Sequence, residues 1–262
     1  GALLTIRRFP EKTYTGEDYL SYQSLNEEML YFLSKSVEGR ASILVSGGTG
    51  SGKTTLLNML SSYIPPQELI ITIEDSCELR LNQPNVRRLE ARMASAENEM
   101  LSVGPRALVK NAMRMRPDRI IVGEIRDGTV VDMVSAMSTG HEGSLSSVHA
   151  NSPANLINSR LPILYSMYGD ASFTPEAQAI QVSEALDLII HVSRLSDGAR
   201  KITHITHVAG LDHGKILLKD IFIYDEHGFH PTGYVPRTLL EKLKKRDVHI
   251  DMNIFEKTKR VG

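Results

Sequence analysis

A glycine-rich stretch early in this 262-residue chain combines the residue types that bind phosphate groups. Glycines let backbone amides approach an anion closely, the lysine would hold the β and γ phosphates, and the hydroxyl of Thr54 would ligate Mg²⁺. The spacing therefore predicts a nucleoside triphosphate site, and the alternative is a flexible turn between a strand and a helix. The stretch reads Gly47-Gly48-Thr49-Gly50-Ser51-Gly52-Lys53-Thr54-Thr55.

Two apolar stretches end in acidic residues. Residues 70–73 lead into Glu74 and Asp75, and residues 120–122 lead through Gly123 into Glu124. Nucleotide hydrolysis needs one acid to hold Mg²⁺ or its waters, and another to orient or deprotonate the attacking water. Alternatively, such carboxylates simply mark where buried strands reach solvent. The presence of both, downstream of a phosphate-binding loop, favours the catalytic interpretation.

A third apolar stretch ends in a histidine. Residues 145–148 lead into His149, whose ring could donate a hydrogen bond to a γ-phosphate and so report its loss. A structural histidine is the alternative, and His141 in the preceding glycine-rich loop is the weaker candidate. His204 and His207 fall on opposite faces of one predicted strand, so a histidine metal site is not expected.

Six arginines form two clusters. Charged clusters are usually solvated faces, but an arginine can also reach a γ-phosphate in the same or a neighbouring subunit. The sequence leaves these alternatives open. One cluster follows the second predicted strand and the other precedes the strand that leads to Glu124: Arg87, Arg88 and Arg92, then Arg114, Arg116 and Arg119.

Strands and helices alternate around these residues. Apolar strands separated by helices predict an α/β fold whose mostly parallel sheet is covered on both faces, with nucleotide at the carboxyl ends of the strands. Strands are expected at 43–45, 69–73, 86–89, 120–122, 145–148 and 188–192, and helices at 25–37, 54–63, 104–115, 129–137, 154–168 and 175–186. A hairpin over 201–208 and 215–224 and a helix over 239–245 follow.

Composition limits the function classes. Lys and Arg total 30 against 31 Asp and Glu, a net charge of −1 that does not favour a large nucleic-acid-binding surface. The single cysteine, Cys77, excludes an internal disulfide framework, agrees with a reducing compartment and is expected to be a buried thiol. No apolar run approaches ~18 residues, so the sequence predicts no membrane span.

Four motifs together resemble the type II/type IV secretion ATPases of the GspE/PilT type, in that family's order. They are Gly47–Thr55 as Walker A, Ile73–Asp75 as the Asp box, Ile120–Asp127 as Walker B and Gly140–Asn151 as the His box. The chain is most similar to the CpaF branch, which assembles Tad (Flp) pili. The sequence features that carry this similarity are residues 3–9, Arg116–Arg119 and Lys219–Phe222.

This resemblance implies a RecA-like P-loop NTPase core over residues 41–195. It also implies a remnant of an N-terminal domain with a linker over 1–40, and a C-terminal hairpin and helix extension over 196–262. The implied activity is Mg²⁺-dependent ATP hydrolysis that powers secretion or pilus assembly. The rival expectations are a RecA-like nucleic-acid-translocating ATPase of the conjugative-transfer type, a nucleotide-gated assembly subunit and a small-molecule kinase.

The resemblance also implies residue roles and partners. Glu74 would polarise the attacking water, Glu124 would hold the metal through water, and His149 would sense the γ-phosphate. Arg7 would complete the site from the N-terminal side, and Lys53 and Thr54 would keep the roles described above. The expected assembly is a homo-hexamer at the cytoplasmic face of the inner membrane. It would contact a platform protein there, with no nucleic acid bound.

Overall fold

The computed structural model describes residues 3–4, 13–92, 102–168 and 174–257. Arg7 and most of residues 3–9, which carry part of the similarity to the CpaF branch, lie outside these ranges. Within them, no helix combines the length and apolar character that crossing a bilayer requires.

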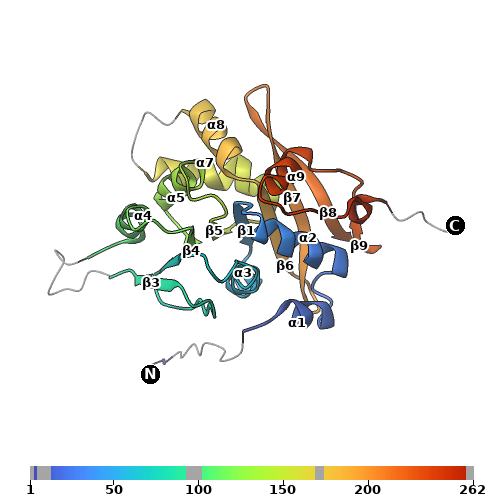
Figure 1. Ribbon diagram of the computed structural model, residues 1–262, viewed down its shortest axis with the longest axis horizontal. Coiled ribbons are helices and arrows are strands. Elements are labelled where there is room, and N and C mark those ends of the chain that lie inside the picture. The colour runs from blue at the N-terminus through green and yellow to red at the C-terminus, as the bar shows by residue number, and fades with distance from the viewer. Residues whose placement is uncertain (1–2, 5–12, 93–101, 169–173, 258–262) are drawn as a thin grey trace.

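One sheet runs through the described part of the chain, with the strand order β3-β2-β4-β5-β1-β6-β7-β8-β9 (Figure 1). The strands from β3 to β6 in this order pair in parallel, as predicted. They are β1 (Ile43–Gly47), β2 (Ile70–Glu74), β3 (Val86–Glu90), β4 (Arg119–Ile125), β5 (Leu145–His149) and β6 (Leu188–Arg194).

The predicted hairpin continues this sheet in antiparallel fashion. β7 (Arg200–Asp212) pairs with β6, and β8 (Lys215–Asp225) pairs with β7. A short ninth strand, β9 (Gly228–Pro231), pairs with β8 and was not expected from the sequence, because four residues carry too little alternation to be recognised. The sheet is therefore mixed, and its parallel part lies on the side where the motifs cluster.

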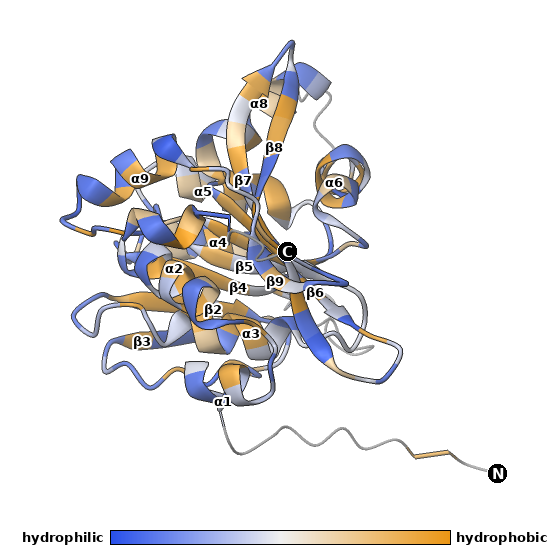
Figure 2. Cartoon of the chain, turned by 90° about the vertical axis from the view of Figure 1, so that its right-hand side faces the viewer, coloured by the Kyte–Doolittle hydropathy of each residue, from blue (hydrophilic) through white to orange (hydrophobic). Residues whose placement is uncertain are grey.

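Helices cover both faces of the sheet, and this explains why the first three residues of β1 are all apolar. Ile43 and Val45 point into one core, which also contains residues of α2, α3 and α9. Leu44, between them, points into a second core formed with α4, α5, α7 and α8. Because successive side chains of a strand alternate between faces, a strand covered on both sides is apolar at successive positions, and the buried Ser46 that follows is hydrogen-bonded to His191. The central strands are accordingly mostly orange in Figure 2.

The helices begin and end close to the predicted positions. The helix expected at 154–168 is divided into α6, a five-residue π-helix at Leu156–Arg160, and α7. The stretch before α2 contains a short helix, α1, whose N-cap Thr15 accepts a hydrogen bond from the Asp18 amide. The bounds are α1 (Gly16–Ser21), α2 (Glu27–Glu38), α3 (Lys53–Ser61), α4 (Pro105–Met113), α5 (Thr129–Ser138), α6 (Pro153–Asn155), α7 (Leu161–Ser166), α8 (Pro175–Ala185) and α9 (Arg237–Lys244).

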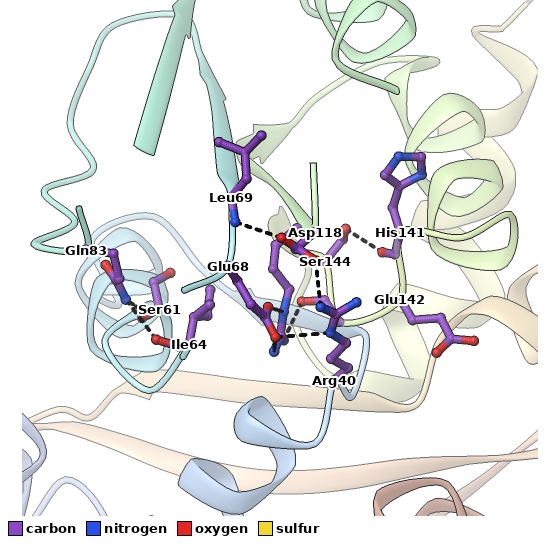
Figure 3. Close-up of polar contacts among 12 residues, drawn as sticks. Arg40, Ser61, Ile64, Glu68, Leu69, Gln83, Asp118, His141, Glu142 and Ser144 are labelled. Carbon is purple, nitrogen blue, oxygen red and sulfur yellow. Dashed lines mark hydrogen bonds and ion pairs between the residues drawn. The ribbon is translucent and has the colours of Figure 1, made fainter. Parts of the chain in front are cut away.

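A buried charge network joins the strands at their amino ends, the edge opposite the motifs. The Arg119 guanidinium, which is fully buried, donates to the Glu68 carboxylate at 2.5 Å and to the carbonyl of Gly143 at 3.1 Å. Arg40 contacts both Glu68 at 3.1 Å and Asp118 at 2.8 Å, and Figure 3 shows these three side chains together. The network links the segments that enter β1, β2, β4 and β5. It therefore helps to fix how these strands are shifted along their axes relative to one another.

Candidate active site

The glycine-rich loop connects the carboxyl end of β1 to the first turn of α3. Gly50 and Gly52 have φ values of 72° and 99°, which favour glycine, and Gly52 is the N-cap of α3. A Cβ on Gly47 would lie 2.4 Å from the carbonyl oxygen of Val192, so this position has no room for a side chain. The loop therefore places backbone amides and a helix N-terminus at one spot, the arrangement that binds phosphate.

The strand order brings the predicted acids to the same spot. β1, β5, β4 and β2 are successive parallel neighbours, so the residues that follow them meet at one edge of the sheet. A cavity of about 1040 Å³ opens there, between the phosphate loop and both acids. Among the predicted site residues it is lined by Thr49, Gly50, Ser51, Gly52, Lys53, Thr54, Thr55, Glu74 and Glu124.

Glu74 is held rigidly with one oxygen unused. Its side chain is 5% exposed, and Oε1 accepts hydrogen bonds from the backbone amides of Glu78 at 3.0 Å and Leu79 at 2.9 Å. Oε2 is buried and has no hydrogen-bond partner among the described residues. The pKa of this carboxyl is raised, because burial raises it by more than the hydrogen bonds from the two amides lower it. A buried polar atom without a partner costs free energy, so Oε2 is suited to a bound water or ligand.

Gly123 makes room for this carboxylate. A Cβ at Gly123 would lie 3.0 Å from Cγ of Glu74, closer than ordinary packing allows. The pairing of β2 with β4 brings Glu74 against Gly123, and this explains why a glycine precedes Glu124.

Glu124 is surrounded by cations. Its Oε1 lies 3.5 Å from Nζ of Lys53, and its Oε2 accepts from the Arg126 guanidinium at 2.5 Å. Burial would raise the pKa of Glu124, but the hydrogen bond from Arg126 and the charge of Lys53 outweigh it and lower the pKa. Lys53 Nζ also donates to the carbonyl of Gly48 at 3.2 Å. The ammonium group of Lys53 thus contacts both the loop and Glu124, and it lies within reach of a phosphate in the cavity.

Oxygen donors at this edge suit a magnesium ion. Thr54 offers a hydroxyl and Glu124 a carboxylate that stays ionised, and both line the same cavity. Mg²⁺ prefers oxygen ligands and usually keeps several waters while sharing the phosphates of a nucleotide. The residues present therefore fit the predicted metal, with Glu124 reaching it directly or through water.

His149 ends β5 beside the loop but does not line the cavity. It pairs in register with Gly47, and its side chain is exposed. Its role as a γ-phosphate sensor stays a prediction. His141 lies in the turn before β5, where burial lowers its pKa and its Nδ1 is buried without a hydrogen-bond partner among the described residues.

The two arginine clusters do not reach this cavity within the described chain. Five of the six are exposed and lie away from its lining: Arg87, Arg88, Arg92, Arg114 and Arg116. Arg119 is neither part of a solvated face nor near a phosphate, because the network described above buries it at the opposite edge. The expectation of a buried Cys77 is also wrong: the thiol is exposed in the loop after Glu74.

The cavity includes residues that the sequence patterns missed. Arg200, at the start of β7, donates from Nε to the carbonyl of Gly50 at 3.1 Å. Tyr14, Tyr19 and Tyr22 lie on the wall beside it, and burial raises the pKa of Tyr19. No local motif marks Arg200, since it is 150 residues from Gly50, and three tyrosines near a short helix are an ordinary apolar pattern.

Comparisons with known proteins agree with this geometry. The family model described as "Type II/IV secretion system protein" matches residues 1–259. The conjugal transfer protein TrbB of Rhizobium radiobacter is 33% identical over 213 residues, which cover 80% of this chain and 61% of TrbB. The type IV secretion system protein VirB11 of Bartonella henselae is 36% identical over 180 residues, covering 68% of this chain and 49% of VirB11.

A solved structure shares the fold. The VirB11 ATPase from the Brucella suis type IV secretion system, in complex with sulphate, matches with a TM-score of 0.62 at 29% identity, over 76% of this chain and 65% of that chain. The chain spans about half the length of the curated relatives it matches. Because the family model spans nearly every residue and the phosphate loop and acids meet at one edge of a RecA-like sheet, this chain belongs to the type II/IV secretion system protein family.

Proposed function

We propose that this protein binds ATP with Mg²⁺ and hydrolyses it at the cavity between the phosphate loop and the two glutamates. The observation that carries the proposal is the position of Glu74 at the same cavity as Lys53 and Thr54, with Oε1 held by two backbone amides and the buried Oε2 without a hydrogen-bond partner among the described residues. A carboxylate held in place by two amides beside a phosphate-binding loop is suited to orient a water for attack.

The resting contacts of the site suggest what each residue does when nucleotide arrives. Lys53 would leave Gly48 and Glu124 to bind the β and γ phosphates, because a phosphate oxygen is a stronger partner than a carbonyl. Thr54 and Glu124 would hold Mg²⁺, which supplies charge neutralisation at the phosphates. His149 would sense the γ-phosphate from the end of β5.

At the level of the whole protein, we propose a motor for a type II/IV secretion system, and specifically for Tad pilus assembly of the CpaF branch. The proposed assembly is a hexameric ring at the cytoplasmic face of the inner membrane, where it contacts a platform protein. Arg7 from the N-terminal side would complete each site. Similarity to VirB11 proteins of type IV secretion systems supports the general role.

A second candidate function is nucleic-acid translocation in conjugative transfer. It is favoured by similarity to TrbB, which is named a conjugal transfer protein. A translocase needs a basic path for the backbone of the nucleic acid, and its affinity falls steeply with salt. The net charge of −1 favours the secretion motor over this alternative. Salt-dependent binding of single- or double-stranded DNA at micromolar concentration would reverse that preference.

The test is steady-state hydrolysis of ATP by the natural full-length protein, with and without Mg²⁺, beside Glu74→Gln and Lys53→Ala. We expect Glu74→Gln to retain nucleotide binding and lose about 10²-fold or more in kcat, the size of a general acid–base contribution. Lys53→Ala should lose binding as well. If the wild type hydrolyses ATP no faster than Glu74→Gln, the catalytic assignment fails. A full-length protein that stays monomeric with ATP would contradict the ring.

A further inference from the structure

Arg126, two residues after Glu124, lies between Asp75, which follows β2, and Glu124, near the end of β4. Its Nη2 and Nε approach Oε2 of Glu124 at 2.5 and 2.6 Å, and its Nη1 lies 3.6 Å from Oδ2 of Asp75. β2 and β4 are direct neighbours in the sheet. One guanidinium therefore links Asp75 to Glu124, and all three residues line the cavity.

The backbone around Arg126 is held on both sides. Before it, Ile125 is the last residue of β4, paired with Val148. After it, Asp127 accepts a hydrogen bond at 2.8 Å from the amide of Thr129, where α5 begins. The arginine side chain itself is 68% exposed, so its contribution to core packing is small. Within the described part of the chain, its ion pairs are with these two carboxylates, and the charge of Glu78 acts on it as well.

The contacts with Glu124 are one-sided. Both donors of Arg126 address Oε2, whereas Oε1 faces Lys53 at 3.5 Å. If Lys53 binds a phosphate as proposed above, Oε1 would be released while Oε2 keeps both donors of Arg126. A guanidinium fixed on one oxygen of a carboxylate prevents its rotation, as partners of metal-binding carboxylates commonly do.

We propose that Arg126 is a positioning residue that orients Glu124 toward the metal of Mg·ATP, and that Asp75 anchors Arg126 in turn. This inference rests on the proposed function of the site. The opposing interpretation is that Arg126 is a resting counter-ion that competes with Mg²⁺ for Glu124. The two differ in sign, because removal of a competitor tightens metal binding and removal of a positioning group weakens it.

The experiment is a Mg²⁺ titration of the affinity for a fluorescent, non-hydrolysable ATP analogue, on the full-length protein. Wild type is compared with Arg126→Gln, Arg126→Lys and Asp75→Asn, and affinity in EDTA gives the metal-free reference for each. Arg237→Gln, an exposed arginine at the start of α9, is the matched control. Melting temperatures establish that each variant is folded. Because the readout is binding, it does not depend on turnover.

We expect Arg126→Gln to raise the Mg²⁺ concentration at half-effect about tenfold, the lower end for partners of a metal-binding carboxylate. Arg126→Lys should raise this Mg²⁺ concentration nearly as much, since an ammonium group cannot reproduce the several fixed donors of a guanidinium. Asp75→Asn should raise it about twofold. An unchanged or lower Mg²⁺ requirement in Arg126→Gln overturns the inference. If wild type shows no Mg²⁺-dependent binding, the proposed function itself fails.

Discussion

Replacing Glu68 by glutamine tests the buried network at the amino edge of the sheet. The change removes one charge from a group that is 7% exposed, while the fully buried Arg119 stays protonated beside it. Arg119 keeps the carbonyl of Gly143, and Arg40 keeps Asp118 (Figure 3). The loss therefore centres on the 2.5 Å contact of Arg119 with Glu68.

The expected cost is about 3 kcal/mol. Removing one partner of a buried ion pair typically destabilises by about 3–5 kcal/mol, because the remaining charge has lost its compensation. The retained carbonyl and the new amide oxygen place this case at the lower end. Burial already lowers the pKa of Arg119 despite Glu68, and the substitution should lower that pKa further.

The assay is urea unfolding at neutral pH, followed by circular dichroism. Glu142→Gln provides the control, because Glu142 pairs with Arg246 at 2.9 Å while the two side chains are 43% and 38% exposed. An exposed pair contributes about 1 kcal/mol or less. If Glu68→Gln costs no more than Glu142→Gln, burial does not decide the energy of this network and the reasoning is refuted.

Three further predictions concern other residues. Gly123→Ala should push Glu74 aside, since the new Cβ would lie 3.0 Å from its Cγ. We expect ATP hydrolysis to fall about tenfold, with little change in melting temperature. Undiminished hydrolysis would contradict the steric argument. His191 is buried beside Ser46, and burial lowers its pKa to about 4. Its folded pKa lies below the unfolded value, so stability is full above pH ~6.5 and falls toward pH ~4, by roughly 2 kcal/mol at pH 5. In urea unfolding, His191→Asn should remove this part of the decrease in the free energy of unfolding between pH 7 and pH 5. An unaltered decrease would show that the histidine is not its cause. Cys77 should react fully with a thiol reagent in the native protein, but more slowly than a free thiol, because partial desolvation and the charges of Glu90 and Glu74 raise its pKa. Protection until unfolding would contradict the exposed position.

The chemistry of the site could be predicted from local patterns. The phosphate loop is a contiguous motif, so its glycines, Lys53 and Thr54 are recognisable without any tertiary contact. Glu74 and Glu124 could be placed because each follows an apolar strand, and parallel strands bring their carboxyl ends to one edge. Alternation of strands and helices was likewise enough to predict the α/β class.

Contacts between distant segments were decided only by the folded chain. Arg200 meets Gly50 across 150 residues because β6 and β7 pair beside β1. Arg119 looked like one of a surface cluster, but the first position of β4 places it in the interior, opposite Glu68. Composition could not distinguish it from exposed Arg116, since burial of a charge depends on whether the fold brings a partner to it. The residue types of the motifs thus indicate the chemistry, and strand pairing determines which other side chains surround it.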